Sequence, residues 1–198
     1  PIFLASFYGL RRSELLGLRW SAIDFQNGWI HIETTVVKEK IGDRVVSTVR
    51  DGTTKTESSR RSLPLCQYTY NYFCWLRQRQ MTQMQLCGAC YNREYLDFVC
   101  VDEMGMLLQP DFVSQKFQQI LVKYGLRPIR FHDLRHSCAT IMLYLNYTMK
   151  DVQQWLGHSN YNFTANTYVH SSKQAQLQMA ESFADRLPAI GPVVTVEG

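Results

Sequence analysis

Residues 131–136 read Phe-His-Asp-Leu-Arg-His and form the densest cluster of polar side chains in the sequence. In a helix, His132 and Arg135 would lie about 60° apart around the axis. The apolar stripe through Leu134 and Cys138 would point to roughly the opposite side. The pattern predicts an imidazole and a guanidinium displayed together, away from the core. Taken alone, the same pattern also fits an ordinary solvated helix face.

The sequence around this cluster predicts a mainly helical chain, because apolar residues recur at helical spacing. The expected helices are residues 2–19 with an interruption near Gly9, 67–85, 110–125, 132–146, 148–156, 163–170 and 172–187. Side chains expected to face inward include Tyr68, Tyr72, Trp75 and Leu76 within 67–85, and Ile141 and Leu145 within 132–146. Runs of β-branched and aromatic residues predict strands at 22–25, 29–37, 41–49 and 60–65. The predicted fold class is mixed, mainly α with a small antiparallel β-sheet near the N-terminus.

Length and composition limit the class of protein. The chain has 198 residues, 45% of them hydrophobic and 19% charged, which suits one globular domain, with or without a small appendage. No stretch approaches the roughly 20 apolar residues of a membrane span, and the net charge of +4 is too mild to imply nucleic acid by itself. Residues 1–10 lack the flanks of a signal peptide and are typical of a helix cut open, with no Met before it. We therefore expect a fragment of a longer protein.

The cysteines do not predict a metal site. Six of them lie at irregular spacings, and without a secretion signal the expected state is free thiols in a reducing cytosol. Cys87 and Cys90 form a single CxxC pair, whereas a zinc site needs a second pair of ligands that the sequence does not offer. We expect a loop with two thiols and no stoichiometric zinc.

Four further polar clusters each have an ordinary interpretation. They are Gly9-Leu10-Arg11-Arg12-Ser13-Glu14, Thr54 to Arg61, Leu156-Gly157-His158-Ser159, and Tyr168 within Thr167-Tyr168-Val169-His170. An arginine beside a glycine at a helix interruption can bind an anion, but Arg11 can equally be a surface residue paired with Glu14. Lysines in polar turns, a His after a helix stop and a Tyr packed with its hydroxyl satisfied are all common.

In order and spacing, the five clusters together resemble the catalytic domain of the tyrosine recombinases, the phage integrase family. That family shows a GLR-x-(S/G)-E-L box, a Lys in a β-hairpin, an H-x-L-R-H box, an LGH box and a downstream Tyr. The matching residues here are Gly9 to Leu15, Lys55, His132 to His136, Leu156 to His158, and Tyr168. The Lys is the weakest match, because hairpin length varies in the family. Lys38, Lys40 and Arg60 are rivals, but Lys55 best fits a position shortly before the strand at 60–65.

The resemblance implies a DNA strand transfer that uses no cofactor, neither ATP nor metal. Tyr168 would attack a DNA phosphodiester, form a 3′-phosphotyrosine and release a 5′-hydroxyl. A 5′-hydroxyl from another strand would then reseal the joint. Arg11 and Arg135 would hold the non-bridging oxygens of the transition state with planar, paired donors.

The remaining roles also follow from the resemblance. His132 would be the general base for the phenol, or the proton carrier of the second step. Lys55 would protonate the leaving 5′-oxygen, and His158 would donate a hydrogen bond to the phosphate. The residues expected to orient these groups are Glu14, Asp133 and His136, the last of which could instead be structural. We expect Arg11→Ala or Arg135→Ala to reduce cleavage greatly and leave the fold intact.

The resemblance further implies an organisation and partners. Residues 1–170 would be the catalytic domain, and residues 171–198 a C-terminal helix and tail that either docks on a neighbouring protomer or packs on its own domain. The expected partners are a double-stranded DNA recombination site, a homotetramer on that DNA, and accessory DNA-bending or directionality proteins. The expected location is the bacterial cytoplasm, at the nucleoid and away from membranes. The length of the hairpin region, residues 36–60, favours an integrase of a phage or mobile element over a chromosome-dimer resolvase.

Two other functions compete with this one. The first is a catalytically silent DNA-binding relative with an architectural or regulatory role, although every expected catalytic position holds a competent residue type. The second is a metal-dependent nuclease, which needs clustered carboxylates that the sequence does not offer.

Overall fold

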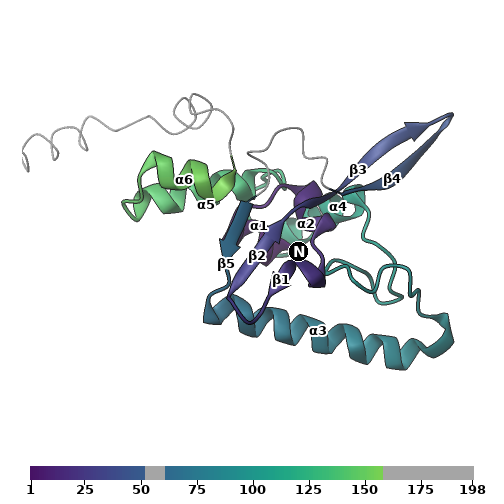
Figure 1. The fold of residues 1–198 in the computed structure, drawn as a ribbon. Coiled ribbons are helices and arrows are strands. Elements are labelled where there is room, and N and C mark those ends of the chain that lie inside the picture. Colours follow the sequence, from purple (N-terminus) through teal and green to yellow (C-terminus); the bar gives the residue numbers. More distant parts are fainter. Residues whose placement is uncertain (52–60, 158–198) are drawn as a thin grey trace, which may run out of the picture. The chain divides into compact units, whose positions relative to one another are not determined.

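The computed structural model of the protein describes residues 1–51 and 61–157 (Figure 1). All of them belong to one unit, Pro1–Tyr161. The predicted class is confirmed, because these residues are mainly helical with small antiparallel sheets. The α-helices are α1 (Ile2–Tyr8), α2 (Arg12–Gly17), α3 (Gln67–Cys87), α4 (Pro110–Lys123), α5 (Asp133–Tyr144) and α6 (Met149–Leu156). Two 3-10 turns complete the helical part, η1 (Trp20–Ala22) and η3 (Gly88–Cys90).

The strands form two small antiparallel sheets in this part of the chain. β1 (Ile23–Asp24), β2 (Trp29–Ile32) and β5 (Arg61–Pro64) form a three-stranded sheet in the order β1-β2-β5. β3 (Thr34–Ile41) and β4 (Arg44–Asp51) form a separate hairpin, paired from Thr34–Asp51 to Ile41–Arg44. Figure 1 shows this hairpin projecting beyond the three-stranded sheet.

The predicted strand boundaries were wrong in this hairpin. The single strand expected over 29–37 is divided at Glu33, and the strand expected over 41–49 begins only after a turn at Gly42-Asp43. Gly42 has φ +61°, which a two-residue hairpin turn requires and a glycine adopts at low cost. The Gly-Asp pair between β-branched runs was the signal that should have placed the turn.

The predicted interruption near Gly9 is confirmed, and it sets the corner between α1 and α2. Gly9 has φ +62° and ends α1 in the left-handed conformation. After the corner, α2 lies directly on the backbone of β3. A Cβ on Gly17 would approach the carbonyl oxygen of Thr34 to 2.3 Å, so only glycine permits this contact. The core beneath the corner includes the fully buried Leu4, Leu15 and Leu16.

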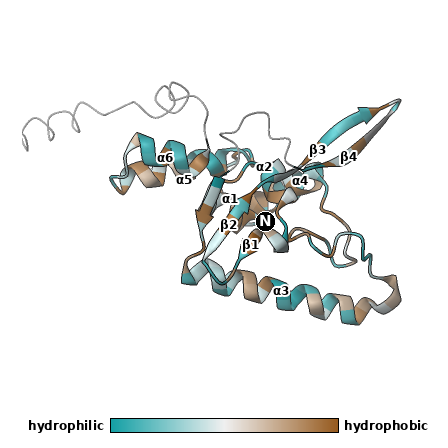
Figure 2. Ribbon diagram, viewed as in Figure 1, coloured by the Kyte–Doolittle hydropathy of each residue, from teal (hydrophilic) through white to brown (hydrophobic). Residues whose placement is uncertain are grey.

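The inward face of α3 matches the prediction only in part. Tyr68 and Trp75 are exposed, whereas Thr69 and Phe73 are fully buried. Thr69 accepts a hydrogen bond of 2.7 Å from the Tyr8 hydroxyl. Polar residues at inward positions hide the stripe, and Figure 2 shows hydrophilic and hydrophobic residues mixed along α3. The pattern therefore placed Tyr72 and Leu76 correctly against the core but was wrong for Tyr68 and Trp75.

The apolar stripe expected on α5 also ends early. Leu134 and Cys138 are buried as predicted, but Ile141 and Leu145 are more than half exposed.

No helix in the described ranges combines the length and hydrophobicity that a bilayer crossing needs.

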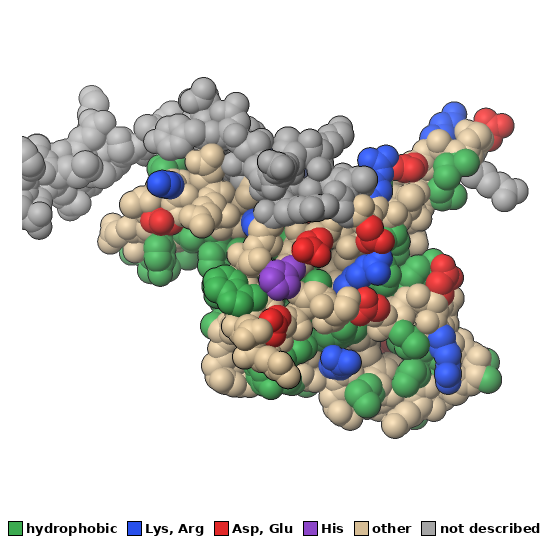
Figure 3. All heavy atoms as spheres, in the orientation of Figure 1, with side chains coloured by type: hydrophobic (Ala, Val, Ile, Leu, Met, Phe, Trp, Pro, Cys, Tyr) green, Lys and Arg blue, Asp and Glu red, His purple; other side chains and the backbone are tan. Residues whose placement is uncertain are grey.

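Surface charge on the hairpin is mixed. Lys38 on β3 pairs with Asp111 of α4, and Arg50 on β4 pairs with Glu39. On the face shown in Figure 3, basic and acidic side chains are interspersed over this region. The hairpin therefore does not present a continuous basic field.

Candidate active site

The site is built where the α1–α2 corner, strand β5, and helices α5 and α6 meet. Arg11 is the N-cap residue of α2, and Glu14 is the third residue of the helix. The backbone N–H of Arg11 donates to Glu14 Oε2 at 2.9 Å, an arrangement typical of a capping box. The local sequence therefore folds Glu14 back toward Arg11 before any tertiary contact is made.

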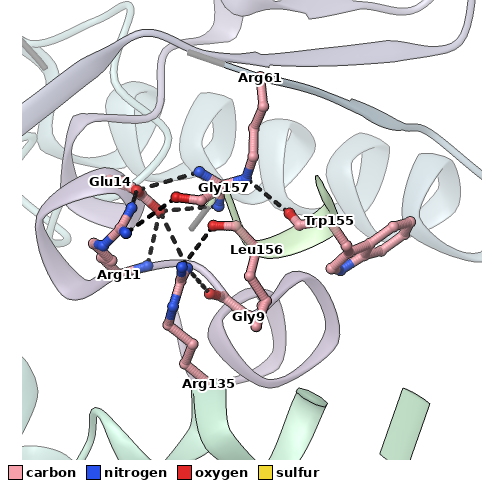
Figure 4. Close-up of polar contacts among 8 residues, drawn as sticks. All are labelled: Gly9, Arg11, Glu14, Arg61, Arg135, Trp155, Leu156 and Gly157. Atoms are coloured by element: carbon pink, nitrogen blue, oxygen red, sulfur yellow. Dashed lines mark hydrogen bonds and ion pairs between the residues drawn. The ribbon is translucent and has the colours of Figure 1, made fainter. Parts of the chain in front are cut away.

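Three guanidinium groups surround the Glu14 carboxylate, which is only 2% exposed (Figure 4). Arg11 Nη1 donates to Oε1 at 2.5 Å. Arg61, from β5, donates to both oxygens, from Nη1 to Oε1 at 3.2 Å and from Nη2 to Oε2 at 3.1 Å. Arg135 Nη1, from α5, lies 3.9 Å from Oε2. Three positive charges around one negative charge leave a net positive site.

The same three arginines bind three consecutive carbonyls at the end of α6 (Figure 4). Arg61 Nε donates to Trp155 O at 2.8 Å, Arg135 Nη2 to Leu156 O at 2.6 Å, and Arg11 Nη2 to Gly157 O at 3.2 Å. The last carbonyls of a helix have no partner within it, and its C-terminus carries a partial negative charge. The arginines donate hydrogen bonds to these carbonyls and bring positive charge to the negative end of the helix. They thereby fix the end of α6 against the α1–α2 corner.

The charges shift the pKa values of the cluster. Burial alone would raise the pKa of Glu14, but Arg61, Arg11 and Arg135 outweigh it and lower that pKa to about 2. Burial lowers the pKa of the Arg135 guanidinium to about 9, and the charge of Arg11 acts in the same direction against Glu14. At neutral pH both groups are therefore charged.

His132 and Arg11 line the same pocket, which has a volume of about 460 Å³. Its basic lining is completed by Arg12, Lys38 and Arg130. Burial, His136 and Arg135 lower the pKa of His132 below its ordinary value of 6.5, so the imidazole is mainly neutral at pH 7. A neutral imidazole beside a guanidinium can accept a proton while the cation holds an anion.

Arg135 does not lie where the helix pattern predicted. Its side chain is 2% exposed, whereas His132 is exposed, so the two are not displayed together on one surface. His132 is the N-cap of α5 and lies outside the helix, which begins at Asp133. Arg135 is buried because its Nη1 donates to Gly9 O at 2.6 Å, which draws the guanidinium beneath the α1–α2 corner.

The remaining expected site residues have different surroundings. Asp133 binds Arg130, with 2.9 Å between Oδ1 and Nη2, and the His132 and His136 rings are in edge contact with centroids 5.1 Å apart. Of the rivals to Lys55, Lys38 lines the pocket with Arg11. Three of the expected catalytic residues, Lys55, His158 and Tyr168, lie outside the described ranges. Arg60, a rival to Lys55, also lies outside them.

Sequence reasoning missed Arg61, which lay in the predicted strand at 60–65 and at the end of the polar cluster Thr54 to Arg61, with no role assigned to it. A signal was present, because side chains two residues apart on a strand share a face. Leu63 is buried at 2% exposure, so Arg61 on β5 must point to the same side as a core residue.

The structure gives the cysteines ordinary surroundings. The Cys87 thiol contacts the carbonyl oxygen of Glu103 at 3.4 Å. Within residues 1–51 and 61–157, no three His, Cys, Asp or Glu side chains gather as a metal site would require.

Comparison with known proteins places the chain in a family. Residues 2–175 match the Phage integrase family, and the chain belongs to that family. It is 30% identical over 191 residues to a tyrosine recombinase XerC-like protein of Caldanaerobacter subterraneus subsp. tengcongensis, covering 93% of this chain and 48% of that protein. It is 26% identical over 187 residues to the ICEBs1 integrase of Bacillus subtilis, again with 93% and 48% coverage. The chain thus spans about half the length of these curated relatives.

Solved structures share the fold. The integrase of transposon Tn1549 in complex with a circular intermediate DNA superposes with a TM-score of 0.74 at 22% identity, over 92% of this chain and 58% of that one. The XerA recombinase gives a TM-score of 0.63 at 19% identity, over 93% and 57%. The fold is therefore that of a tyrosine recombinase catalytic domain, as the sequence resemblance implied.

Proposed function

We propose that the protein is a site-specific DNA recombinase that cleaves and rejoins strands through a 3′-phosphotyrosine. The observation that carries this proposal is the convergence of Arg11, Glu14 and Arg135 beside the pocket that holds His132. A net positive site next to a neutral imidazole suits a phosphodiester whose transition state gains negative charge. The relatives also support it, because their names are those of recombinases, integrases and transposases.

Arg11 is the residue best placed for direct contact with the phosphate. Its side chain is 35% exposed at the pocket. A guanidinium carries five N–H groups, and within the described part of the chain one N–H of each terminal nitrogen is used. Arg135 is buried, with its donors on the carbonyls of Gly9 and Leu156, and it adds a second positive charge behind Arg11 for the non-bridging oxygens.

The proton transfers complete the proposed reaction. A phenol with a pKa near ~10 is a weak nucleophile at neutral pH, so Tyr168 gives its proton to His132 as its oxygen attacks phosphorus. The bond from phosphorus to the 5′-oxygen breaks, Lys55 protonates that oxygen, and His158 donates a hydrogen bond to the phosphate. The bond energy stays in the phosphotyrosine, so the rejoining step needs neither ATP nor metal.

The organisation and partners are part of the same proposal. Residues 1–170 form the catalytic unit, with Asp133 and His136 supporting the His132 end of the site. Residues 171–198, expected as a C-terminal helix and tail, lie outside the described ranges, as does the helix expected at 163–170. Four protomers assemble on a recombination site in the bacterial cytoplasm. The long β3–β4 hairpin, which spans Thr34 to Asp51, favours integration or excision of a phage or mobile element.

A pool of nicked duplexes of random sequence tests the proposal even though the target sequence is unknown. A nick next to the cleavage point lets the leaving strand diffuse away and traps the covalent intermediate. The wild-type protein should yield protein–DNA complexes that survive SDS and form equally well in EDTA, and sequencing the captured DNA then identifies the site. Tyr168→Phe should yield none, whereas Tyr144→Phe, at a tyrosine that is 85% exposed on α5, should behave as wild type. DNA binding without any adduct would contradict the proposal and favour the silent relative.

A further inference from the structure

Arg61 connects the two structures that hold the site together. Its hydrogen bonds to the described residues are directed inward: two to the Glu14 oxygens and one to the carbonyl of Trp155. One planar guanidinium thus binds a carboxylate end-on through Nη1 and Nη2 and, through Nε, the end of α6. A lysine could not make this set of contacts, because its ammonium group is a single compact charge.

Burial separates the role of Arg61 from that of Arg11. The Arg61 side chain is 7% exposed, against 35% for Arg11, and Arg61 does not line the pocket that Arg11 shares with His132. A phosphate in that pocket would therefore meet Arg11, whereas Arg61 lies on the far side of Glu14. Arg61 can influence the reaction only through the residues it holds.

Glu14 transmits this influence. Its carboxylate binds Arg11 by the guanidinium and by the backbone N–H. Both of these bonds come from Arg11, so they do not by themselves hold the carboxylate against a shift of the Arg11 side chain. Arg61 binds both oxygens from a different element, β5, and fixes the carboxylate, which keeps the Arg11 donors aimed at one point. Positioning of this kind is expensive to lose, because a displacement of about 1 Å can cost about 100-fold in rate.

We propose that Arg61 is a positioning residue for phosphodiester cleavage, which locks Glu14 and the end of α6 so that Arg11 is held ready for the phosphate. This inference rests on the proposed function and deepens it. It separates the cluster into one arginine that faces the substrate and one that sets its geometry.

The test compares wild type with Arg61→Lys, Arg61→Gln and the matched control Arg79→Gln on DNA captured from the random nicked pool. Arg79 pairs with Glu103 at 3.7 Å on the exposed surface of α3, so the control removes an equal charge elsewhere. For each protein, the measurements are the first-order rate of adduct formation at saturating protein, the Kd for the same DNA, and the folded fraction. The rate is also followed against pH.

Arg61→Gln should slow adduct formation by about 10- to 100-fold while the Kd changes by less than about threefold. The rate falls in acid as His132 becomes protonated, and Arg61→Gln should add a second fall to this one, because Glu14 protonates at higher pH without Arg61. Arg61→Lys should restore the pH profile more than the rate, since it returns charge without the planar geometry.

Unchanged rates and pH profiles in folded Arg61 variants would overturn the inference. A lower rate of adduct formation that is fully explained by a weaker Kd or a smaller folded fraction would overturn it as well. These outcomes leave the proposed function intact, since the wild type still forms an adduct. A wild-type protein that forms no adduct overturns the proposed function itself and this role with it.

Discussion

Gly157 accepts a hydrogen bond of 3.2 Å from the guanidinium of Arg11, although 146 positions separate the two residues in the sequence. The bond joins the α1–α2 corner to the last turn of α6. Because His158 follows Gly157 directly, an arginine proposed to bind the phosphate is tied to the backbone next to a histidine with the same proposed target. The polar cluster therefore stabilises the fold and is also the proposed catalytic centre.

Replacing Glu14 by Gln should lower stability in a way that depends on pH. The folded protein holds the pKa of Glu14 at about 2, below its ordinary value of 4.5. The ionised carboxylate therefore stabilises the fold fully above about pH 4.5, and this stabilisation is lost as pH falls toward 2. Urea unfolding should show a loss of about 3 kcal/mol at pH 7 in Glu14→Gln, shrinking at pH 3.

The matched control for this experiment is Glu39→Gln, which removes a carboxylate paired with Arg50 on the partly exposed hairpin. Such surface pairs contribute little, about 0 to 1 kcal/mol. A Glu14→Gln penalty that is equal at pH 7 and pH 3 would show that the carboxylate charge does not stabilise the cluster.

Arg11→Ala and Arg135→Ala should both suppress cleavage but should differ in stability. Arg135 is buried, and its loss leaves the carbonyls of Gly9 and Leu156 without their donor. We expect Arg135→Ala to lose about 3 kcal/mol of unfolding free energy. The partly exposed Arg11 should cost only about 1 kcal/mol. We therefore expect both variants to fold, with Arg135→Ala the less stable of the two, and equal unfolding midpoints would contradict the buried placement of Arg135.

Gly9→Ala should destabilise the corner for two independent reasons. A side chain at φ +62° is strained, and the new Cβ would approach Leu156 Cδ2 to 2.3 Å. We expect a loss of about 2 kcal/mol in urea unfolding. Gly125→Ala is a useful control, because Gly125 follows the end of α4 with φ +61° but has nothing within 4 Å of its Cβ position. If the two variants lose the same amount, contact with Leu156 contributes nothing.

The rate of adduct formation should fall on the acid side of neutrality. The pKa of His132 lies below its ordinary value, so neutral imidazole is available at pH 7 and is lost as pH decreases through that pKa. His132→Gln should remove this limb and slow the reaction by about 100-fold or more. His31→Gln, at a residue bound to Ser62 on the sheet, should retain the limb. An identical acid limb in His132→Gln would exclude His132 as the base.

The residue types of the site could be predicted from the sequence, because Arg11, Glu14, His132 and Arg135 each lie in a short, recognisable cluster. Their convergence was expected only from the family resemblance, since the residue pattern alone does not show how segments far apart in the chain pack together. The carbonyls of Trp155, Leu156 and Gly157 carry no side-chain signal at all.

The errors in the fold have the same physical origin. Thr69 is polar in sequence yet fully buried, because its hydroxyl is satisfied by Tyr8. A hydrophobic pattern cannot identify such a position, and it therefore rotated the predicted face of α3 toward Tyr68 and Trp75. Arg61 was missed for a related reason, since a buried charge is recognised only when its partners are known.

The most direct measurement is mass spectrometry of the trapped adduct after digestion with protease and nuclease. The account predicts one modified peptide, with a nucleotide joined through its 3′-phosphate to the oxygen of Tyr168. A nucleotide attached at any other residue, or joined to Tyr168 through a 5′-phosphate, would contradict it.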